Sequence, residues 1–582
     1  MDPLAVVAID FGTTYSGWAF SFRHNYELDP TKVYSKTWVG GTHISRKGIG
    51  PTCILINPDG KTADSFGYDA ESKYAEKAEE NEQDQWFFFK RFKMLLFKDQ
   101  GITRSATLED ESGKKLPAMT VFSLSIDYIK KNVLDTLNKQ VDNSLEVDEI
   151  HWVLTVPAIW NDAAKQFMRE AAQKAGIPGK NLTICLEPEA ASIYCRHLQV
   201  SKSQADGEKT SLAQFSSGTK YLVLDAGGGT VDITVHEVTT SGELKELHKA
   251  SGGAWGGIQV DKAYEAFISS IIGRHVIMQF KKRHLDDYIE IFRDFEIIKR
   301  EISPSKQDKI TFRIPASLSE LCCEMTGKDL KTLILQSPFS GQIRVATDKL
   351  KVHADVVREF FHPSVKNIID LVVSLLKEPP ALGCVAILMV GGFSASSMLQ
   401  ERVRKEFPNL RIIVPEEAGL AVLKGAVIFG HEPTAINERI IRYTYGTGSI
   451  HKYDKRCQHP TGRVERKSNG ELVCYDIFNI HASEGQSIKL NEEQPELIYT
   501  PAEDGQDCIG FEIYSSPKKH PYFTFENDCK QIGYLSIPIL DKSLGQNRRF
   551  GCTFIFGGTE ICVKVVDKEN GKVTYESINF LG

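Results

Sequence analysis

The stretch Ala5-Val6-Val7-Ala8-Ile9-Asp10-Phe11-Gly12-Thr13-Thr14 decides the fold, because an apolar run leads into an aspartate and a tight glycine–threonine turn. Further along, Tyr221-Leu222-Val223-Leu224-Asp225-Ala226-Gly227-Gly228-Gly229-Thr230 has the same form. Each stretch predicts a buried strand and then a turn whose backbone N–H groups and threonine hydroxyls face an anion. The aspartate would repel a phosphate, but it can hold an accompanying Mg²⁺ through water. Two such turns predict two similar halves that clamp one nucleotide.

Length and composition favour a soluble protein of several domains. The chain has 582 residues, of which 41% are hydrophobic and 25% charged, and this length exceeds what one hydrophobic core supports. The formal charge of −6 is small, and no basic stripe dominates, so nucleic acid is not expected as a partner. The short run Lys281-Lys282-Arg283 is expected to be a solvated helix face.

Cysteines and apolar runs indicate the compartment. The 12 cysteines are scattered without metal-ligand spacing, which is typical of reduced, buried thiols. The N-terminus shows no signal-peptide pattern, and no apolar run approaches the ~20 residues that span a bilayer. We therefore expect a cytoplasmic protein without membrane insertion, with the nucleus as a second compartment.

The first 432 residues alternate strand and helix patterns, which predicts an α/β architecture with two related lobes. Strands are expected at 16–22, 153–156 and 385–390, with a half-buried strand from Val231 to Val235. A solvent-facing helix is expected at 69–84, and a helix capped by Asn161 or Asp162 should end before Gly176. Further helices are expected at 258–282, 286–302 and 354–377 and from Ser394. Residues 201–219 are rich in Ser, Gly, Gln and Lys and predict a loop.

From about residue 438 helical periodicity gives way to short strand candidates. They lie at 510–514, 534–540, 552–556, 561–566 and 573–580, with turn residues between them. We therefore expect a nucleotide-binding domain at 1–432, with its second phosphate motif starting near 220, and an all-β domain at 433–582.

The order of these motifs resembles the actin-like ATPase superfamily and, within it, the 70-kDa heat-shock chaperones. Matching stretches are Ala8 to Ser16, Thr155 to Ala158, Glu187 to Ala191, Asp225 to Asp232, Val390 to Ser394, and Pro415 to Ala426. Other residues are closest to the divergent heat shock 70 kDa protein 12 branch: Phe11, Gly17, Ala19, Pro51-Thr52-Cys53, Arg442 to Gly446 and Asn579-Phe580-Leu581. The resemblance implies a two-lobed actin-like ATPase with duplicated RNase H-like lobes, followed by a β-sandwich without a helical lid.

The resemblance also implies roles for matching residues. The catalytic set would be Lys90, Glu187, Asp225 and Asp232, with Lys90 beside the γ-phosphate. Asp10 and Asp225 would hold Mg²⁺, and K⁺ is a further expected cation. The nucleotide, ATP or ADP, would be bound by Gly12, Thr13, Thr14, Tyr15, Gly227, Gly228, Gly229, Thr230, Glu296, Lys299, Arg300, Ser303, Gly391, Gly392 and Phe393. Outside the motif order, Lys90 would be an ordinary surface lysine, and Glu296 with Lys299 a routine helix pair.

Several positions depart from the family pattern. Ala395 stands where the common chaperones have a second arginine that stacks on the base, so Arg300 would carry more of that contact. Lys165 takes the position of a relay arginine and keeps its charge without the planar fork. The usual acidic, leucine-rich linker is replaced by residues 436–445.

Together these features predict an atypical chaperone with weak ATPase activity. Its partners would be unfolded or extended protein segments, or specific proteins, held by the β-domain through backbone pairing. Two alternatives stay open: a nucleotide-binding interaction protein with little turnover, and a sugar-kinase-like phosphotransferase. The kinase would need a carboxylate base at a sugar hydroxyl, for which the sequence offers no distinct candidate. The oligomeric state is not predicted.

Overall fold

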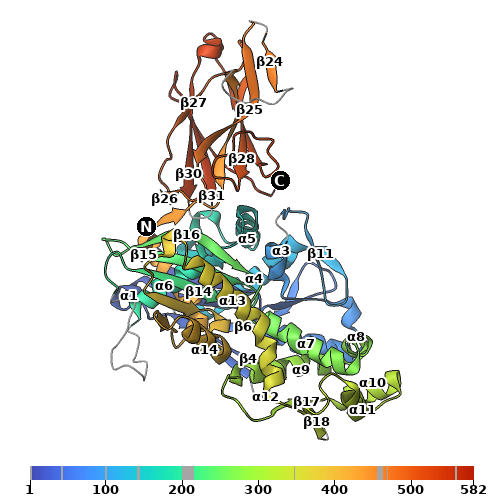
Figure 1. The fold of residues 1–582 in the computed structure, drawn as a ribbon. Coiled ribbons are helices and arrows are strands. Elements are labelled where there is room, and N and C mark those ends of the chain that lie inside the picture. The colour runs from blue at the N-terminus through green and yellow to red at the C-terminus, as the bar shows by residue number, and fades with distance from the viewer. Residues whose placement is uncertain are drawn as a thin grey trace. The chain divides into compact units, whose positions relative to one another are not determined.

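The structure is a computed structural model that describes residues 3–40, 44–98, 101–140, 145–198, 215–346, 348–454, 463–467, 470–557 and 560–581. The chain divides into two compact units (Figure 1). The first comprises Met1–Trp160, Met168–Val235 and Ala250–Ala435, and the second comprises Asn161–Phe167, His236–Lys249 and Ile436–Gly582. None of the helices in the described ranges is long and apolar enough to cross a membrane.

A mixed sheet in the first unit carries the first aspartate turn. Strand β1 (Ala5–Phe11) pairs in parallel with β12 (Ile150–Val156) and antiparallel with β2 (Tyr15–Phe22), and β12 pairs in parallel with β13 (Leu182–Leu186). The apolar side chains of β1 are buried on both faces, as expected for a central strand of a covered α/β sheet. Asp10 stands opposite Thr155 where both strands end.

A second sheet in the same unit repeats this arrangement. Four strands of this seven-stranded sheet, β21 (Arg411–Ile413), β20 (Ala386–Val390), β14 (Lys220–Ala226) and β15 (Val231–Val238), follow the order β21-β20-β14-β15, which corresponds to β13-β12-β1-β2 in the first sheet. Asp225 stands opposite Val390 near the end of β14. The two strands that carry the aspartate turns therefore hold equivalent places in two sheets.

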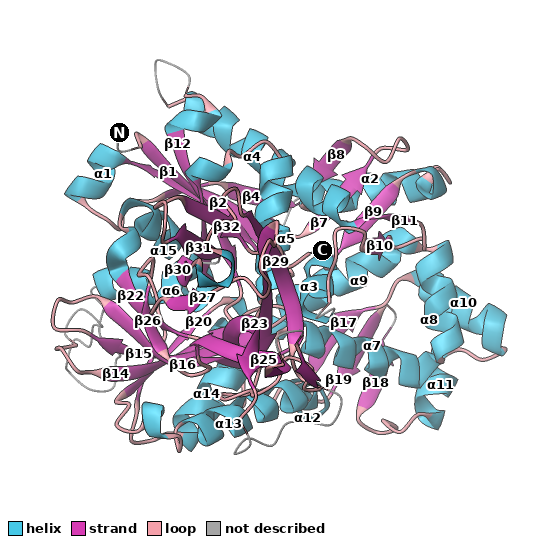
Figure 2. Cartoon of the chain, turned by 90° about the horizontal axis from the view of Figure 1, so that it is seen from above, coloured by secondary structure: helices cyan, strands magenta, loops and turns pink. Residues whose placement is uncertain are grey.

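Helices of the first unit lie around these sheets. Amphipathic sequences place Ile, Phe and Leu side chains of α7 to α14 in one large core with the strands of the second sheet. Helices α13 and α14 lie side by side (Figure 2). The main helices are α2 (Tyr68–Glu79), α4 (Ala118–Asn138), α6 (Glu187–His197), α7 (Ile258–Ile272), α8 (Arg274–Arg283), α9 (Leu285–Ile298), α12 (Ala354–Arg358), α13 (His362–Leu375), α14 (Ser397–Glu406) and α15 (Ala421–His431).

The second unit is a β-sandwich, drawn in orange to red in Figure 1. One sheet has the order β24-β25-β23-β28-β29, and the other β27-β30-β31-β32. Alternating apolar residues from both sheets, such as Phe511 and Phe554, share one core. The strands are β23 (Thr444–Lys452), β24 (Val464–Arg466), β25 (Leu472–Ala482), β27 (Leu497–Tyr499), β28 (Cys508–Ser516), β29 (Lys530–Pro538), β30 (Phe550–Gly557), β31 (Glu560–Asp567) and β32 (Val573–Ser577).

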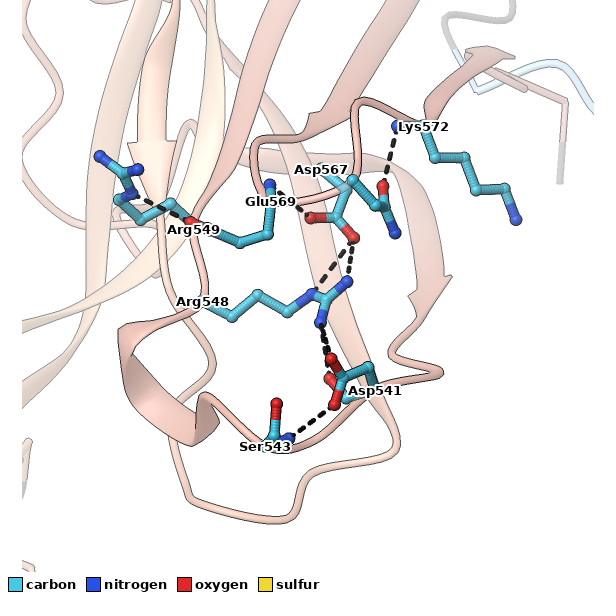
Figure 3. A network of polar contacts seen from close by, with 8 residues as sticks. Asp541, Ser543, Arg548, Arg549, Asp567, Glu569 and Lys572 are labelled. Atoms are coloured by element: carbon cyan, nitrogen blue, oxygen red, sulfur yellow. Dashed lines mark hydrogen bonds and ion pairs between the residues drawn. The ribbon is translucent and has the colours of Figure 1, made fainter.

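A buried ion pair joins Arg548, just before β30, to Asp567 at the end of β31 (Figure 3). The Arg548 guanidinium donates to Asp567 Oδ2 from Nη2 at 2.6 Å and from Nε at 3.2 Å. Its third nitrogen, Nη1, donates to the backbone oxygen of Asp541 at 2.6 Å. Arg548 is 3% exposed and Asp567 is 7% exposed, so both charges depend on these bonds.

Most predicted elements are confirmed. Strand β2 matches the prediction at 16–22, and β12 contains the strand at 153–156. Each of the five late strand candidates overlaps one strand from β28 to β32, although those at 534–540 and 573–580 extend past the ends of β29 and β32. The capped helix is α5 (Asp162–Lys174), where Ala164 N donates to Asn161 Oδ1 at 2.9 Å. The loop predicted at 201–219 lies outside the described residues up to position 214.

Three structural expectations were wrong in detail. The helix expected at 258–282 is two helices, α7 and α8, which meet at Gly273. The strand expected to be half buried, β15, is buried on both faces, because Asp232 and Thr234 are each only 1% exposed. The helix expected to face solvent, α2, buries Tyr68, Ala70 and Tyr74.

Candidate functional site

The two glycine–threonine turns lie against each other and form a cradle of about 80 Å³. A Cβ atom on Gly228 would come within 1.8 Å of Thr14 Oγ1, and one on Gly229 within 2.6 Å of Thr13 Oγ1. Only glycine therefore allows this approach. The predicted residues that line the cradle are Asp10, Gly12, Thr13, Thr14, Tyr15, Glu187, Asp225, Gly227, Gly228, Gly229, Thr230, Gly391 and Gly392.

Hydrogen bonds hold both turns in shape. In the first turn, Thr52 Oγ1 donates to the Gly12 carbonyl at 2.7 Å, and Thr52 N donates to the Thr14 carbonyl at 2.9 Å. In the second turn, the Gly228 carbonyl accepts from Ile258 N at 2.8 Å, at the start of α7. Carbonyl oxygens are thus engaged outside the cradle, which is the arrangement that an anion-binding turn requires.

Donors on β12 and in the turn after it hold two of the predicted carboxylates, of which Asp10 lines the cradle and Asp232, only 1% exposed, does not. Thr155 Oγ1 donates to Asp10 Oδ1 at 2.7 Å, and Ile159 N donates to Asp232 Oδ1 at 2.8 Å. Asp225 is 4% exposed, and its Oδ2 has no hydrogen-bond partner within the described part of the chain. A Cβ on Gly391, whose φ is +84°, would come within 2.3 Å of Asp225 Oδ1. The polar atoms of Asp225 are therefore enclosed on one side and left for a ligand on the other.

These carboxylates repel one another. Burial, and next the charge of Glu187, raise the pKa of Asp10 to about 6 and that of Asp232 to about 7. Burial and Glu187 also raise the pKa of Asp225 well above its ordinary value. The nearby ammonium of Lys93 acts in the opposite direction on all three pKa values. The cradle therefore carries a surplus of negative charge that a bound cation would relieve.

Lys93 lies at this cluster, and its position was not anticipated from the motif order. The side chain is 2% exposed, its Nζ donates to Glu187 Oε1 at 2.8 Å, and it lies 5.0 Å from the Trp160 ring centroid. It belongs to a 3-10 turn, η2 (Phe92–Met94), that follows Arg91 in the left-handed region at φ 55°. The apolar residues on both sides of Lys93 were the available signal for burial.

Lys90, the lysine singled out by the motif order, lies elsewhere. It ends strand β9 (Phe87–Lys90), and its Nζ is 3.8 Å from Glu111 Oε2 and 5.9 Å from the Tyr288 ring. It is absent from the residues that line the cradle and instead borders an adjoining cavity. The left-handed turn at Arg91 explains the difference, because it redirects the chain between the two lysines.

The residues predicted to contact adenosine form an ion-pair cluster at the end of α9. Lys299 Nζ lies 2.6 Å from Asp261 Oδ1 and also pairs with Glu296. Arg300 Nη2 donates to Glu296 Oε1 at 2.7 Å, and the hydroxyl of Ser303 lies 3.1 Å from that of Ser305. These four residues do not line the cradle.

Phe393 was also expected at the nucleotide. Its ring is 8% exposed and stacks on Phe361 with centroids 6.5 Å apart, so the ring is part of the core. The flanking Gly391 and Gly392 do line the cradle. Of this motif, the structure therefore brings the glycines to the site and turns the aromatic ring away from it.

Comparison with known proteins agrees with this geometry. The family model described as Hsp70 protein matches residues 72–407. Heat shock 70 kDa protein 12B of Homo sapiens is 33% identical over 632 residues, which cover 99% of this chain and 91% of that protein. Heat shock 70 kDa protein 12A of Homo sapiens and of Mus musculus are each 33% identical over 627 residues, with 99% and 92% covered. The expected resemblance to the protein 12 branch is thus confirmed, and the chain belongs to the Hsp70 family.

Proposed function

We propose that this chain binds ATP with Mg²⁺ in the cradle and hydrolyses the nucleotide slowly. One observation carries the proposal: two glycine–threonine turns face each other, and three carboxylates (Asp10, Glu187 and Asp225) and the buried Lys93 line the cradle between them. The turns suit phosphate groups, and the surplus of carboxylates suits the divalent cation that accompanies them.

The cradle fits a hydrated Mg²⁺ in its chemistry. The enclosed Oδ2 of Asp225 is an acceptor that lacks a donor among the described residues, and the raised pKa of Asp10 shows that its charge is poorly compensated. Within the described ranges, no group of three or more His, Cys, Asp or Glu side chains is arranged to hold a metal alone. Asp10 and Asp225 would therefore act on the ion together with water and phosphate oxygens. When bound, Mg²⁺ supplies neutralisation of phosphate charge.

The chain's own residues would position the reacting groups. Thr13, Thr14 and Thr230 would donate to the phosphates, and Lys93 would offset the charge that develops on the terminal phosphate. Glu187, held by Lys93, and Asp232, held by the Ile159 N–H, would orient the attacking water. We assign Lys93 the role for which the motif order favoured Lys90, because Lys93 is the lysine that contacts Glu187.

The same proposal covers the domains. Residues 1–432 would form a two-lobed actin-like ATPase, supported by the repeated order of the two sheets. Residues 433–582 would form a substrate-binding-like sandwich that engages extended protein segments or specific proteins. Strands β29 and β32 each stand at one end of their sheet, which supports binding by strand addition.

A second candidate is a nucleotide-binding interaction protein with little turnover. It is favoured by the ion-pair cluster, because Arg300 and Lys299 are engaged with acidic neighbours rather than open to a base. Adenosine would have to displace these pairs, which would weaken or slow binding.

Calorimetry with ATP and ADP, with and without Mg²⁺, tests the proposal alongside steady-state phosphate release. We expect Mg²⁺-dependent binding and slow turnover, both reduced at least tenfold by Asp225→Asn. The matched control is Asp370→Asn, an exposed position on α13. Tight binding without phosphate release would favour the second candidate, and no nucleotide binding would defeat both.

A further inference from the structure

The turn at 157–160, which directly follows β12, contacts two of the side chains assigned to the reaction. The Ile159 N–H donates to Asp232 Oδ1 at 2.8 Å. The next residue, Trp160, places its indole ring beside the ammonium of Lys93, with Nζ 5.0 Å from the ring centroid. Trp160 is 3% exposed and Lys93 is 2% exposed, so little water reaches this contact.

The Lys93 ammonium has three N–H groups, and its surroundings engage it in two ways. One N–H donates to Glu187 Oε1 at 2.8 Å, which is its one hydrogen bond within the described part of the chain. The Trp160 ring supplies the second contact, and an indole face attracts a cation more strongly than other aromatic side chains do. Lys93 also lines the cradle, so its remaining donors are available to a ligand there.

Several carboxylates compete for this ammonium. Burial and Glu187 raise the pKa values of Asp10, Asp225 and Asp232, but the charge of Lys93 lowers each of them, so all three attract it. A lysine has a flexible four-carbon stem, and contacts beside the ammonium therefore decide which of these groups it faces. An aliphatic side chain in place of the indole would fill space without attracting the cation.

The backbone that carries Lys93 is anchored by contacts that do not involve Trp160. The neighbouring Phe92 ring packs against the rings of Phe11 and Phe122, with centroids 5.9 Å and 5.1 Å away, and all three are buried. We therefore expect replacement of Trp160 to leave this backbone in place and to change the direction of the lysine side chain.

We propose that Trp160 is a positioning residue, whose ring directs the ammonium of Lys93 toward the cradle and the terminal phosphate of a bound nucleotide. The indole face would favour the ammonium beside Glu187 and restrict the rotamers of the lysine. Trp160 would not touch the nucleotide and would act only through Lys93. The inference rests on the proposed function, in which Lys93 offsets the charge that develops on that phosphate.

Two substitutions separate the aromatic face from the volume of the side chain. Trp160→Leu keeps an apolar group without a π face, and we expect it to lower phosphate release at saturating Mg·ATP by at least about tenfold. Trp160→Phe keeps an aromatic face and should restore most of that rate. The matched control is Trp86→Leu, because the Trp86 ring also has an ammonium near it, that of Lys77 at 5.7 Å, but does not line the cradle. This control should leave turnover unchanged.

Calorimetry distinguishes positioning from a general loss of structure. Mg·ADP lacks the terminal phosphate, so Trp160→Leu should bind it as the wild type does. Orthovanadate added to the Mg·ADP complex mimics the transferred phosphoryl group, and its affinity should fall by at least about tenfold in this variant. In a Lys93→Met background, Trp160→Leu should have no further effect on turnover or vanadate affinity, because it acts through the lysine.

Tryptophan fluorescence tests the contact in the chain without nucleotide. Lys93→Met removes the ammonium and should shift the emission of the wild-type chain, but not that of Trp160→Phe. Lys93→Arg keeps a cation at the ring and should cause a smaller shift. If no nucleotide binds, the proposed function fails, whereas this comparison still supports or overturns the pairing of Trp160 with Lys93. It also decides if Trp160→Leu does not fold, which melting curves establish.

Any of four results would overturn the inference. The first is wild-type turnover in folded Trp160→Leu, and the second is an equal loss in Trp160→Phe, which would indicate packing alone. The third is a loss of Mg·ADP affinity as large as that of vanadate, because the ring would then support the whole site. The fourth is an emission that Lys93→Met leaves unchanged in the wild-type chain.

Discussion

Lys93 Nζ donates to Glu187 Oε1 at 2.8 Å, and the lysine side chain is only 2% exposed. An ammonium group in this position lies in a low-dielectric site, where its effect on developing phosphate charge is large. We expect Lys93→Met to lower the rate of phosphate release about 10²-fold or more, the typical effect of removing one preorganised donor. Steady-state phosphate release measures this, with Lys98→Met, an exposed lysine of the next helix, as the matched control.

Lys93→Arg provides a check on folding, because it keeps the charge beside Glu187. Its melting temperature should stay near that of the wild type, with an intermediate loss of turnover since the guanidinium is larger. A deeper loss of turnover in Lys90→Met than in Lys93→Met would return the role to Lys90, as the motif order predicts.

Thr155 is predicted to orient Asp10 for the cation. It is fully buried, and its hydroxyl donates to Asp10 Oδ1 at 2.7 Å, which leaves Oδ2 for the cradle. Thr155→Val removes the donor and should weaken Mg·ATP binding about tenfold, which corresponds to about 1.4 kcal/mol. Thr155→Ser should restore it. Calorimetry across Mg²⁺ concentrations measures the effect, and equal weakening in the serine variant would indicate a packing role instead.

The sequence predicted the cradle well because its signal is local. An apolar run, an aspartate and a glycine turn lie within about ten consecutive residues, and the repeat of that pattern predicted two equivalent strands, β1 and β14. The register of β1 with β12 also brings Thr155 to Asp10, and both positions lay in motifs that the sequence had singled out.

Other features could not be predicted because they depend on backbone geometry or tertiary contacts. The left-handed residue Arg91 decides which of two nearby lysines reaches Glu187, and no propensity indicates such a turn at an arginine. The ion pairs of Asp261 join residues far apart in the chain. Strand β25 was missed because Asp476, at φ 62°, interrupts its alternation.

The second unit is expected to lose stability in mild acid because of His481. Burial lowers the pKa of this histidine from 6.5 to about 4, and its Nε2 lies 3.1 Å from the Tyr499 hydroxyl. Above pH 6.5 both folded and unfolded forms are neutral. Between that pH and about 4, His481 binds a proton in the unfolded state but not in the folded state. The free energy of unfolding therefore falls by up to about 1.4 kcal/mol for each unit by which the pH is lowered.

Hydrogen exchange of peptides from residues 470–557, followed against pH, measures this loss. His481→Phe, which removes the titrating group and retains an aromatic ring against Phe554, should flatten the profile in this window. An unchanged profile in that variant would assign the acid sensitivity to other groups.

Replacing one partner of the Arg548–Asp567 ion pair is predicted to destabilise the sandwich strongly, whereas replacing both partners with apolar residues is not. Asp567→Asn or Arg548→Met leaves a buried charge uncompensated and should cost about 3–5 kcal/mol, whereas the double variant Arg548→Met with Asp567→Leu should be close to neutral. Arg549 pairs with Glu569 at 3.3 Å and is 61% exposed, so Arg549→Met should change stability by less than about 0.5 kcal/mol.

All 6 tryptophans precede residue 256, so fluorescence follows the first unit, while hydrogen exchange of peptides after residue 436 follows the second. A single-variant loss that is confined to the hydrogen exchange of the second unit supports the prediction. Additive losses in the double variant would contradict it, because additivity means that the two side chains do not interact.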